Sequence, residues 1–439
     1  MRRVLLWAAI AVAGCDDEAP RRPALADDAG SGRDRGLDPG PMDQALPTLD
    51  AEADAEPDAA VDADAEADAA VDAGPGVETD PCGRALHPDP DRARVAVVGF
   101  PFGAEPGVDG TTLGFFAIGD DGHLTPVGER LDVATRPLRL RFLPSGDYLV
   151  VLGEDGIVHT VAMAGDDAPA IVDSIALPGA GWADLVVDPD GEHLHVTRRD
   201  VGDDSGVYSV AIGCGATLEP LAEHLSLRLA DTLALLPGDP DRAVLIGGQT
   251  AFAPFDMRDT RLIERREDGG WRERAAFDLW GDFVDTFGIA IAPDGRTALV
   301  PNGSPISDEG GQVMVVGIEG DALRERQRIA GMDDARAAWF HHKGTALVTR
   351  LEPGRVSVLV EEPAGYAVVD ELRYGLPEDL AMVQRGALDG LVVLPAVSAA
   401  TGSQMVTLWV DGAGVVEEIA VLPLAEGGLN IPGAVAVAP

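Results

Sequence analysis

The sequence is poor in positive charge, and above all in lysine. Its 439 residues include 33 lysines and arginines against 75 acidic residues, which gives a formal net charge of −42, and Lys343 is the single lysine. An excess of negative charge of this size argues against nucleic acid and anionic lipid surfaces as partners, because both are negatively charged themselves. It suits a basic protein or a divalent cation, and it also serves simply to keep a protein soluble.

The motifs of several enzyme classes are missing. The chain has no G-x-S-x-G nucleophile elbow, no phosphate-binding G-x-x-x-x-G-K-[ST], no H-E-x-x-H and no G-x-G-x-x-G after a strand. Cysteine is scarce as well, since Cys15, Cys82 and Cys214 are the whole set. Each of them has another predicted role below, so no obvious thiol nucleophile is left. Chemistry by carboxylates stays open, because acidic residues occur throughout the chain.

A short apolar run follows the first residues. Arg2 and Arg3 precede residues 4–12 (VLLWAAIAV), and the small residues Ala13 and Gly14 lead to Cys15. This pattern is typical of an export signal, and the run is too short to span a bilayer. Small residues directly before a cysteine resemble the bacterial lipobox, in which cleavage leaves that cysteine lipidated at the new N-terminus. The resemblance implies a signal peptide over 1–14 and lipidation of Cys15; an ordinary secretory signal is the alternative.

The segment after the signal is acidic and nearly without aromatic residues. Residues 16–80 carry 20 acidic and 4 basic side chains, and residues 50–74 are a low-complexity tract of Asp, Glu, Ala and Val. Such a segment cannot bury enough apolar surface to offset its ordering entropy. We therefore expect a disordered tether over 15–80, a folded domain over 81–439, and an exported protein. Its lipid anchor would hold it to a bacterial membrane, facing the periplasm or the cell exterior.

Cys82 and Cys214 remain once the anchor is set aside. An oxidising compartment and an even number of cysteines favour a disulfide between them. The bridge would fix the end of the tether to the third repeat of the folded domain. Because the sequence does not show whether the two Cα atoms come close, a pair of free thiols is the alternative.

A unit of two apolar strands joined by a tight turn recurs along the chain. Clear copies occupy residues 138–151, 184–196, 232–246 and 288–300, and looser copies occupy 335–348 and 379–394. The first four turns contain Pro144, Pro189, Pro237 and Pro293, which follow one another at intervals of 45, 48 and 56 residues. Self-similarity at such a period indicates a solenoid or a propeller.

The two ends of the repeat region complement each other. Residues 433–439 (GAVAVAP) form half a unit with no second strand after it, and residues 94–98 (RVAVV) form a strand with no inner strand before it. Pairing these two strands closes a ring. The sequence therefore predicts an all-β fold, a seven-bladed β-propeller whose first blade is completed by the C-terminal strand.

Acidic residues recur near the start of the predicted inner strands. Asp184, Asp231, Asp334 and Asp379 occupy such positions, and Asp285 lies slightly earlier in its blade. Because inner strands surround the central channel, these residues predict an acidic ring at one mouth, with the oxygen ligands that calcium and magnesium prefer. The alternative is that each aspartate accepts hydrogen bonds from nearby backbone N–H groups. No other cofactor is indicated.

Two pairs of histidines also qualify as metal ligands by residue type. His193 and His195 lie two apart on a strand and point to the same face, but no third ligand has a recognisable spacing, so a structural or surface role is favoured over metal binding. His341 and His342 are expected on opposite faces of a strand end. That arrangement is poor for joint coordination.

The turns resemble those of a known group of propellers. Residues 188–196 (DPDGEHLHV) and 292–300 (APDGRTALV) are similar to the inner hairpin of lactonase-type and YVTN-type propellers, in which a Pro-Asp-Gly turn joins the first two strands of each blade. The resemblance covers most of residues 85–439 and implies the fold. Some lactonase-like members hydrolyse sugar lactones, but no motif here matches their active-site residues. The WD dipeptide and the Kelch double glycine are lacking, which argues against those propeller classes.

Three functions stay open from the sequence. The first is a monomeric, non-enzymatic lipoprotein whose propeller is a binding or scaffold module for a protein or polymer of the envelope. The second is a metal-assisted hydrolase of the lactonase type, in which the acidic ring would hold a cation as a Lewis acid. The third is a purely structural envelope component.

Overall fold

The computed structural model describes the repeat region of the chain. The described residues are 82–83, 94–102, 109–163, 168–200, 204–221, 224–247, 258–280, 284–304, 310–352, 354–377, 379–398, 402–424 and 433–439. The predicted signal peptide (1–14), the predicted lipid anchor at Cys15 and the predicted tether (15–80) lie outside them. Those three remain predictions.

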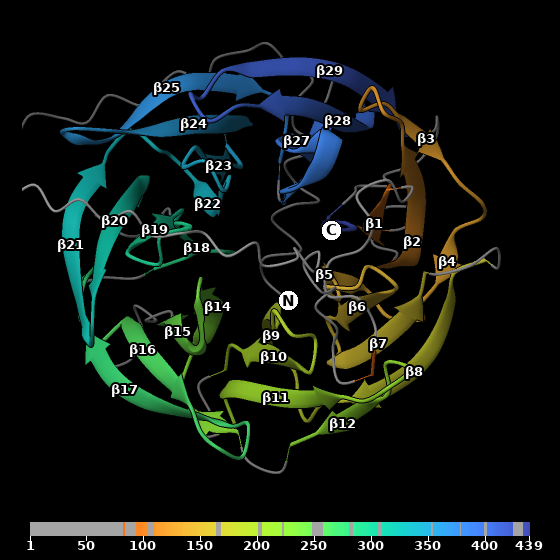
Figure 1. The fold of residues 1–439 in the computed structure, drawn as a ribbon, viewed down its shortest axis with the longest axis horizontal. Helices are drawn as coiled ribbons and strands as arrows, with labels where there is room; N and C mark the ends of the chain where they lie inside the picture. The colour runs from red at the N-terminus through yellow and green to blue at the C-terminus, as the bar shows by residue number, and fades with distance from the viewer. Residues whose placement is uncertain are drawn as a thin grey trace, which may run out of the picture. The chain divides into compact units, whose positions relative to one another are not determined.

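The described residues form seven antiparallel sheets around one centre, which are the seven blades of a β-propeller (Figure 1). From the centre outward, the strands are as follows. Blade 1 has β30 (Val435–Val437), β1 (Arg94–Phe102), β2 (Asp109–Ile118), β3 (Leu124–Pro126) and β4 (Leu131–Asp132). Blade 2 has β5 (Pro137–Phe142), β6 (Tyr148–Gly153), β7 (Ile157–Ala162) and β8 (Ala170–Ala176). Blade 3 has β9 (Trp182–Val187), β10 (His193–Arg198), β11 (Gly206–Ile212), β12 (Leu218–Pro220) and β13 (Leu225–Ser226).

The remaining four blades have four strands each. Blade 4 has β14 (Ala230–Leu236), β15 (Asp239–Gly247), β16 (Thr260–Arg265) and β17 (Trp271–Phe277). Blade 5 has β18 (Ala290–Ile291), β19 (Thr297–Asn302), β20 (Gln312–Glu319) and β21 (Ala322–Ile329). Blade 6 has β22 (Ala335–Phe340), β23 (Ala346–Arg350), β24 (Arg355–Glu362) and β25 (Gly365–Arg373). Blade 7 has β26 (Ala381–Met382), β27 (Leu391–Ser398), β28 (Gly402–Val410) and β29 (Val416–Pro423), with the short 3₁₀ helix η1 (Gly386–Leu388) between β26 and β27.

The ring is closed by the C-terminal strand, as the sequence predicts. β30 pairs antiparallel with β1, with Ala96 opposite Val437 and Val98 opposite Val435. The inner strand of blade 1 thus comes from the far end of the chain. Blade 1 has no other inner strand among the described residues, so closure depends on this pairing.

The turns between first and second strands follow from their sequence. Gly191 and Gly295 have positive φ values of 74° and 68°, a region that residues with a Cβ rarely adopt. The N–H of Gly191 donates to the backbone oxygen of Asp188 at 3.0 Å, and that of Gly295 donates to Ala292 at 2.8 Å. These hydrogen bonds close the Pro-Asp-Gly turns predicted from the repeats.

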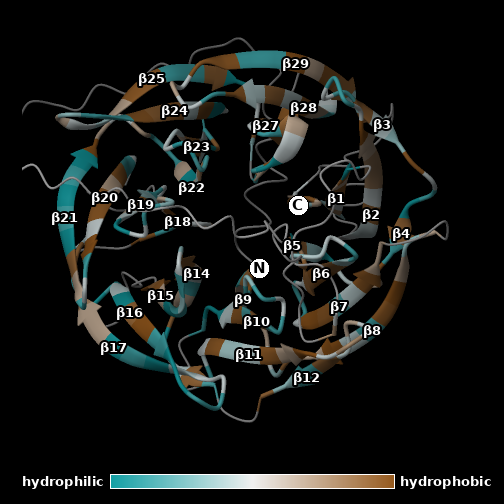
Figure 2. Ribbon diagram, in the orientation of Figure 1, coloured by the Kyte–Doolittle hydropathy of each residue, from teal (hydrophilic) through white to brown (hydrophobic). Residues whose placement is uncertain are grey.

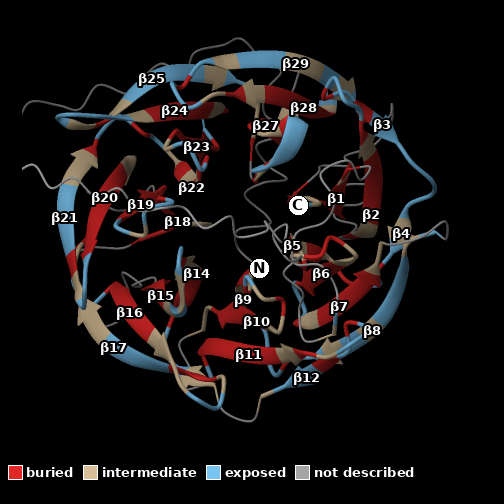
Figure 3. Cartoon of the chain, viewed as in Figure 1, coloured by how far each residue is buried: buried red, intermediate tan, exposed pale blue. Residues whose placement is uncertain are grey.

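The apolar core lies between the blades. The second strands are buried on both faces, as in β6 and β19, and the fourth strands are largely exposed, as in β8 and β29 (Figure 3). Each of the seven described apolar clusters joins two neighbouring blades, so every interface between blades has its own core. Hydrophobic residues accordingly concentrate in the middle strands, and the outer strands carry more polar ones (Figure 2). Among the described residues, none forms a helix long and apolar enough for a membrane crossing.

Cys82 and Cys214 form a disulfide in the structure, with their Cα atoms 5.4 Å apart. Cys214 lies in the turn between β11 and β12 of blade 3. The bridge therefore connects the residues just before the propeller to the outside of blade 3.

Replacing both cysteines by serine should lower the free energy of unfolding by about 2–4 kcal/mol, because the bridge closes a long loop in the unfolded chain. The two cysteines are 132 positions apart. Denaturant unfolding of the oxidised protein and of the double variant measures the difference. In reductant the two proteins should unfold at the same midpoint; equal midpoints without reductant would contradict the prediction.

Candidate functional site

A cavity of about 640 Å³ runs along the central channel. Its walls are the inner strands of the blades, and most of the side chains on them are apolar, including Phe142, Val186, Leu235, Ile289 and Trp339. Charged residues lie mainly towards the end where the inner strands begin. We call this end the upper mouth, and we call the end where the inner strands turn into the second strands the lower mouth.

The carboxylate of Asp184 lies at the upper mouth, but it does not stand among other acids. Its Oδ1 is 3.3 Å from Nε of Arg139 and accepts the backbone N–H of Leu185 at 2.9 Å, and its Oδ2 accepts the hydroxyl of Thr232 at 2.7 Å. The side chain is almost fully buried. Asp184 thus joins blades 2, 3 and 4 by hydrogen bonds.

Two further arginines form ion pairs with the aspartates at the upper mouth in blades 4, 5 and 6. Nε of Arg199 is 3.2 Å from Asp231, and its Nη1 is 3.5 Å from Asp285. Arg336 contacts the other oxygen of Asp285 at 2.9 Å and also pairs with Asp334. Burial lowers the pKa of Arg199, but the charges of Asp231 and Asp285 outweigh burial and raise it. The guanidinium therefore stays charged between these two aspartates.

Asp379 is buried in the wall of the cavity. One of its oxygens accepts the backbone N–H of Leu380 at 3.0 Å, and the other accepts that of Val435 in the closing strand at 3.3 Å. Burial raises the pKa of this carboxyl, against the opposing charges of Arg141 and Arg139. Asp379 therefore keeps a proton more readily than an exposed aspartate does.

The predicted ring at the upper mouth is not purely acidic. The upper mouth is a mixed ring, because arginines pair with Asp184, Asp231, Asp285 and Asp334. A calcium or magnesium ion there would have to displace a guanidinium, and the four predicted ligands Asp184, Asp231, Asp334 and Asp379 form no group with ligand atoms within 4.8 Å of one another among the described residues. Asp184 and Asp379 each accept the backbone N–H of the following residue, in line with the alternative role as acceptors of nearby N–H groups, whereas Asp334 accepts that of Glu352, 18 positions further on.

Sequence reasoning missed the arginines of the channel. Arg139 and Arg141 alternate along β5 (PLRLRF), so both face the channel, and this spacing was the available signal. Arg139 reaches across to the backbone oxygen of Phe287 in blade 5 at 2.9 Å, and so narrows the upper mouth. Arg141 lies deeper, where its Nη1 donates to the backbone oxygen of Leu140 at 2.8 Å and its Nη2 is 4.0 Å from Asp184. Its side chain is 35% exposed.

Two blades carry a titratable residue at the corner of the lower mouth. The first turn residue is apolar in blades 2, 4 and 5, where it is Leu143, Leu236 and Ala292, but it is Asp188 in blade 3 and His341 in blade 6. Both residues are fully or almost fully buried. Within the described part of the chain, these corners supply the two groups of His and Asp side chains that lie close enough to share a metal ion.

At the corner of blade 3, Asp188 belongs to a buried network. Nε2 of His195 lies 3.0 Å from Oδ1 of Asp188, and the guanidinium of Arg265 contacts the same oxygen. The indole N–H of Trp271 donates to Nδ1 of His195 at 3.0 Å, so the imidazole proton sits on Nε2 and donates to Asp188. The structural role predicted for His195 is confirmed.

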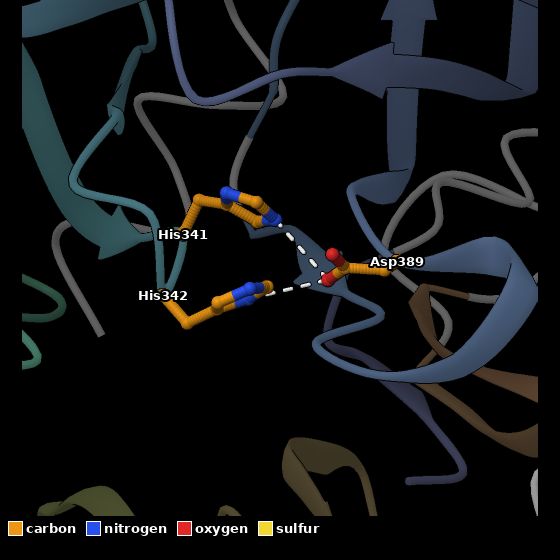
Figure 4. A group of neighbouring side chains, drawn as sticks. All are labelled: His341, His342 and Asp389. Atoms are coloured by element: carbon orange, nitrogen blue, oxygen red, sulfur yellow. Dashed lines mark hydrogen bonds and ion pairs between the residues drawn. The ribbon is translucent and has the colours of Figure 1, made fainter.

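At the corner of blade 6, His341 and His342 do not lie on opposite faces of a strand end, so that prediction is wrong. Nε2 of His341 and Nδ1 of His342 both lie 3.2 Å from Oδ1 of Asp389 (Figure 4). β22 ends at Phe340, so the two histidines lie in the turn, where the alternation of a strand does not apply. Asp389 comes from the next blade, just before β27.

Comparison with known proteins identifies the fold. No family model matches the chain, and no curated protein matches it in sequence. A protein from Lactobacillus plantarum superposes with a TM-score of 0.61 at 12% identity, over 79% of this chain and 100% of the other. The periplasmic gluconolactonase of Pseudomonas aeruginosa (TM-score 0.57, 13% identity, 79% and 99% covered) and a putative 6-phosphogluconolactonase of Bacteroides fragilis (0.57, 12%, 80% and 99%) are similar too. The chain therefore shares the β-propeller fold of these proteins; identities this low show the fold alone.

Proposed function

We propose that the protein is a binding module whose central channel takes up one small organic anion of the size of a sugar acid. The observation that carries this proposal is the combination of the cavity with Arg141 inside it. A volume of about 640 Å³ falls in the range of sites that bury a small ligand, and mostly apolar walls with a few convergent polar groups are typical of such sites.

Arg141 supplies the recognition of an anion. A guanidinium has five N–H donors in a planar fork that matches a carboxylate or phosphate. Among the described residues, Arg141 meets the backbone oxygen of Leu140 and, more distantly, Asp184, so several donors remain for a ligand. Asp379, with its raised pKa, is placed to donate a hydrogen bond to a ligand oxygen when it is protonated.

Binding is favoured over catalysis by what lines the cavity. The described lining residues include no histidine, serine, threonine, cysteine or lysine, so the bases and nucleophiles left there are carboxyls. Two of these carboxyls, those of Asp184 and Asp188, pair with arginines. We further propose that lipidation of Cys15 anchors this module in the cell envelope. The loops around the upper mouth are then the place where a protein or polymer partner of the envelope would bind.

Replacing Arg141 by alanine should weaken the binding of a sugar acid about 10- to 100-fold, because a hydrogen-bonded charge pair in a channel is lost. Isothermal titration of the protein with gluconate, and with a phosphorylated sugar acid, measures the effect.

Arg324→Ala is the matched control, because Arg324 lies on the outer strand β21, is 71% exposed and is 4.0 Å from Glu319. It should bind like the unaltered protein. If the unaltered protein bound neither class of anion, or if both variants bound equally well, the channel would not be an anion site.

Hydrolysis of a lactone in the same channel is the second candidate function. It is favoured by the protonatable carboxyl of Asp379 beside Arg141 and by the gluconolactonase among the proteins of similar fold. A metal-assisted version is less well supported, because arginines occupy the predicted ligands. The test is whether the protein hydrolyses glucono-lactone faster than the uncatalysed reaction. If it does, and if Asp379→Asn abolishes this activity, the function is catalysis and not binding alone.

A further inference from the structure

We propose that His341, His342 and Asp389 form a binding site for a divalent transition metal, with Zn²⁺ as the best fit, at the lower-mouth corner of blade 6. This corner is at the opposite end of the propeller from the mixed ring of arginines and aspartates. The site is therefore separate from the proposed anion site, and either proposal can fail without the other.

The spacing of the three ligand atoms matches a zinc shell. In a tetrahedral site with ligand atoms about 2.1 Å from the ion, neighbouring ligand atoms lie about 3.4 Å apart. Nε2 of His341 and Nδ1 of His342 are each 3.2 Å from Oδ1 of Asp389, and the three atoms lie within 4.8 Å of one another. Figure 4 shows the two imidazoles turned towards the same carboxylate oxygen. Small movements would admit an ion.

The ligand types also suit zinc. Two imidazole nitrogens and one carboxylate oxygen are a common protein set for Zn²⁺, and three protein ligands leave the fourth position to water. Calcium and magnesium prefer oxygen ligands throughout, so the two nitrogens discriminate against them. His342 is 42% exposed, which gives an ion access from solvent.

The corner is held in place by the neighbouring blade. Gln384 of blade 7 accepts the backbone N–H of His342 at 3.0 Å and donates to the backbone oxygen of Phe340 at 2.9 Å. These two hydrogen bonds fix the turn that carries both histidines against the blade that carries Asp389. Held ligands lose less entropy when they bind an ion than mobile ones do.

Lys343 competes with a metal at this corner, but it can leave. Its Nζ is 2.9 Å from Oδ2 of Asp389, which is not the oxygen that the histidines share, and its side chain is 53% exposed. The group of Asp188, Asp190 and His193 in blade 3 is less suitable, because Arg265 contacts Asp188 there and is itself mostly buried, with its guanidinium 5.4 Å from the ring of Trp271. That cation has no comparable route to solvent.

The test is isothermal titration of the full chain with Zn²⁺, after treatment with a chelator and without a polyhistidine tag. We expect one ion per chain. His342→Ala and Asp389→Asn should each weaken binding at least tenfold, and His123→Ala should not, because His123 is an exposed histidine beside Asp121. Absence of Zn²⁺ binding, or unchanged affinity in both corner variants, would overturn the proposal.

Two further measurements identify the ligands. Co²⁺ in place of Zn²⁺ should give the visible absorption of a four- or five-coordinate ion, and His342→Ala should abolish it. Lys343→Ala should tighten Zn²⁺ binding several-fold, because a competing positive charge is removed. Weaker binding in Lys343→Ala, or loss of binding in His193→Ala instead of His342→Ala, would show that the ion binds to other residues.

Discussion

Removal of residues 433–439 should lower the unfolding midpoint more than any other change of similar size. β30 is the inner strand of blade 1, and three backbone hydrogen bonds at its ends, Gly99 to Ala434, Gly433 to Gly99 and Ala438 to Val95, measure 2.9 Å each. Without β30 the inner edge of β1 is exposed, and exposed strand edges pair with other chains.

Deletion of β30 also removes apolar contacts at two of the interfaces between blades. Val435 belongs to the apolar cluster between blades 7 and 1, and Ala434 and Ala436 belong to the cluster between blades 1 and 2. Both clusters open to water when the strand is deleted. Burial of apolar side chains and the lost backbone hydrogen bonds together are worth about 5 kcal/mol or more, a large part of the stability of a typical domain.

Thermal unfolding followed by circular dichroism measures this effect, and size-exclusion chromatography shows whether the exposed edge causes aggregation. Deletion of Pro439 alone is the control, because this residue is exposed and lies beyond β30. A finer pair is Val435→Asp against Val437→Asp, since Val435 is 1% exposed and Val437 is only partly buried. Cooperative unfolding at an unchanged midpoint after the full deletion would show that β30 does not close the ring.

Replacing Asp188 by asparagine should lower the free energy of unfolding by about 3–5 kcal/mol, because it removes the buried counter-charge of Arg265 and leaves that arginine only an exposed acidic partner. Asp188 accepts from His195 at 3.0 Å and from Arg265, and both partners are largely buried. The substitution keeps the volume of the side chain and removes its charge. The expected loss is therefore electrostatic and does not come from packing.

Asp241→Asn is the matched control for this change. Asp241 contacts the same arginine, with 3.6 Å between its Oδ1 and Nε of Arg265, but its side chain is 70% exposed. An exposed ion pair contributes about 0–1 kcal/mol. Denaturant unfolding of both variants should thus separate them clearly, and equal losses would mean that burial of Asp188 contributes nothing.

The same network makes stability depend on pH on the acid side. Burial lowers the pKa of His195, and the N–H that Trp271 donates to its Nδ1 requires the neutral ring. Burial raises the pKa of Asp188, but the neighbouring His193 and the hydrogen bonds from His195 and Arg265 outweigh burial and hold this pKa well below its usual range. Both groups bind protons more readily when the chain is unfolded, so acid favours unfolding.

The stability that comes from keeping His195 neutral is therefore fully present above the pKa of about 6.5 that a histidine has in the unfolded chain. It is lost as the pH falls below that value. The contribution of Asp188 is complete above about pH 4 and is lost at still lower pH. The free energy of unfolding, measured from pH 8 down to pH 3, should therefore decrease first below about pH 6.5, because of His195, and again below about pH 4, because of Asp188. In Asp188→Asn the fall below about pH 4 should be smaller than in the unaltered protein.

The repeat pattern of the sequence was sufficient to predict the seven-bladed ring and how it closes. Each inner hairpin is made by residues close in the chain, such as the turn at Gly191, and the half unit at the C-terminus has one complementary strand, 94–98. Local hydrogen bonds and alternation of apolar residues depend on neighbours in sequence, so a single chain reveals them. The predicted turn role of the aspartates was recoverable for the same reason.

Which charged groups meet, in contrast, became known only from the folded chain. Arg139 and Phe287 are 148 positions apart, and His341 and Asp389 are 48 apart. Such contacts depend on the placement of one blade against another, and the sequence spacing of two residues says nothing about it. The arginines that neutralise the predicted acidic ring, and the histidines that share Asp389, therefore became visible only when the blades were assembled around the channel.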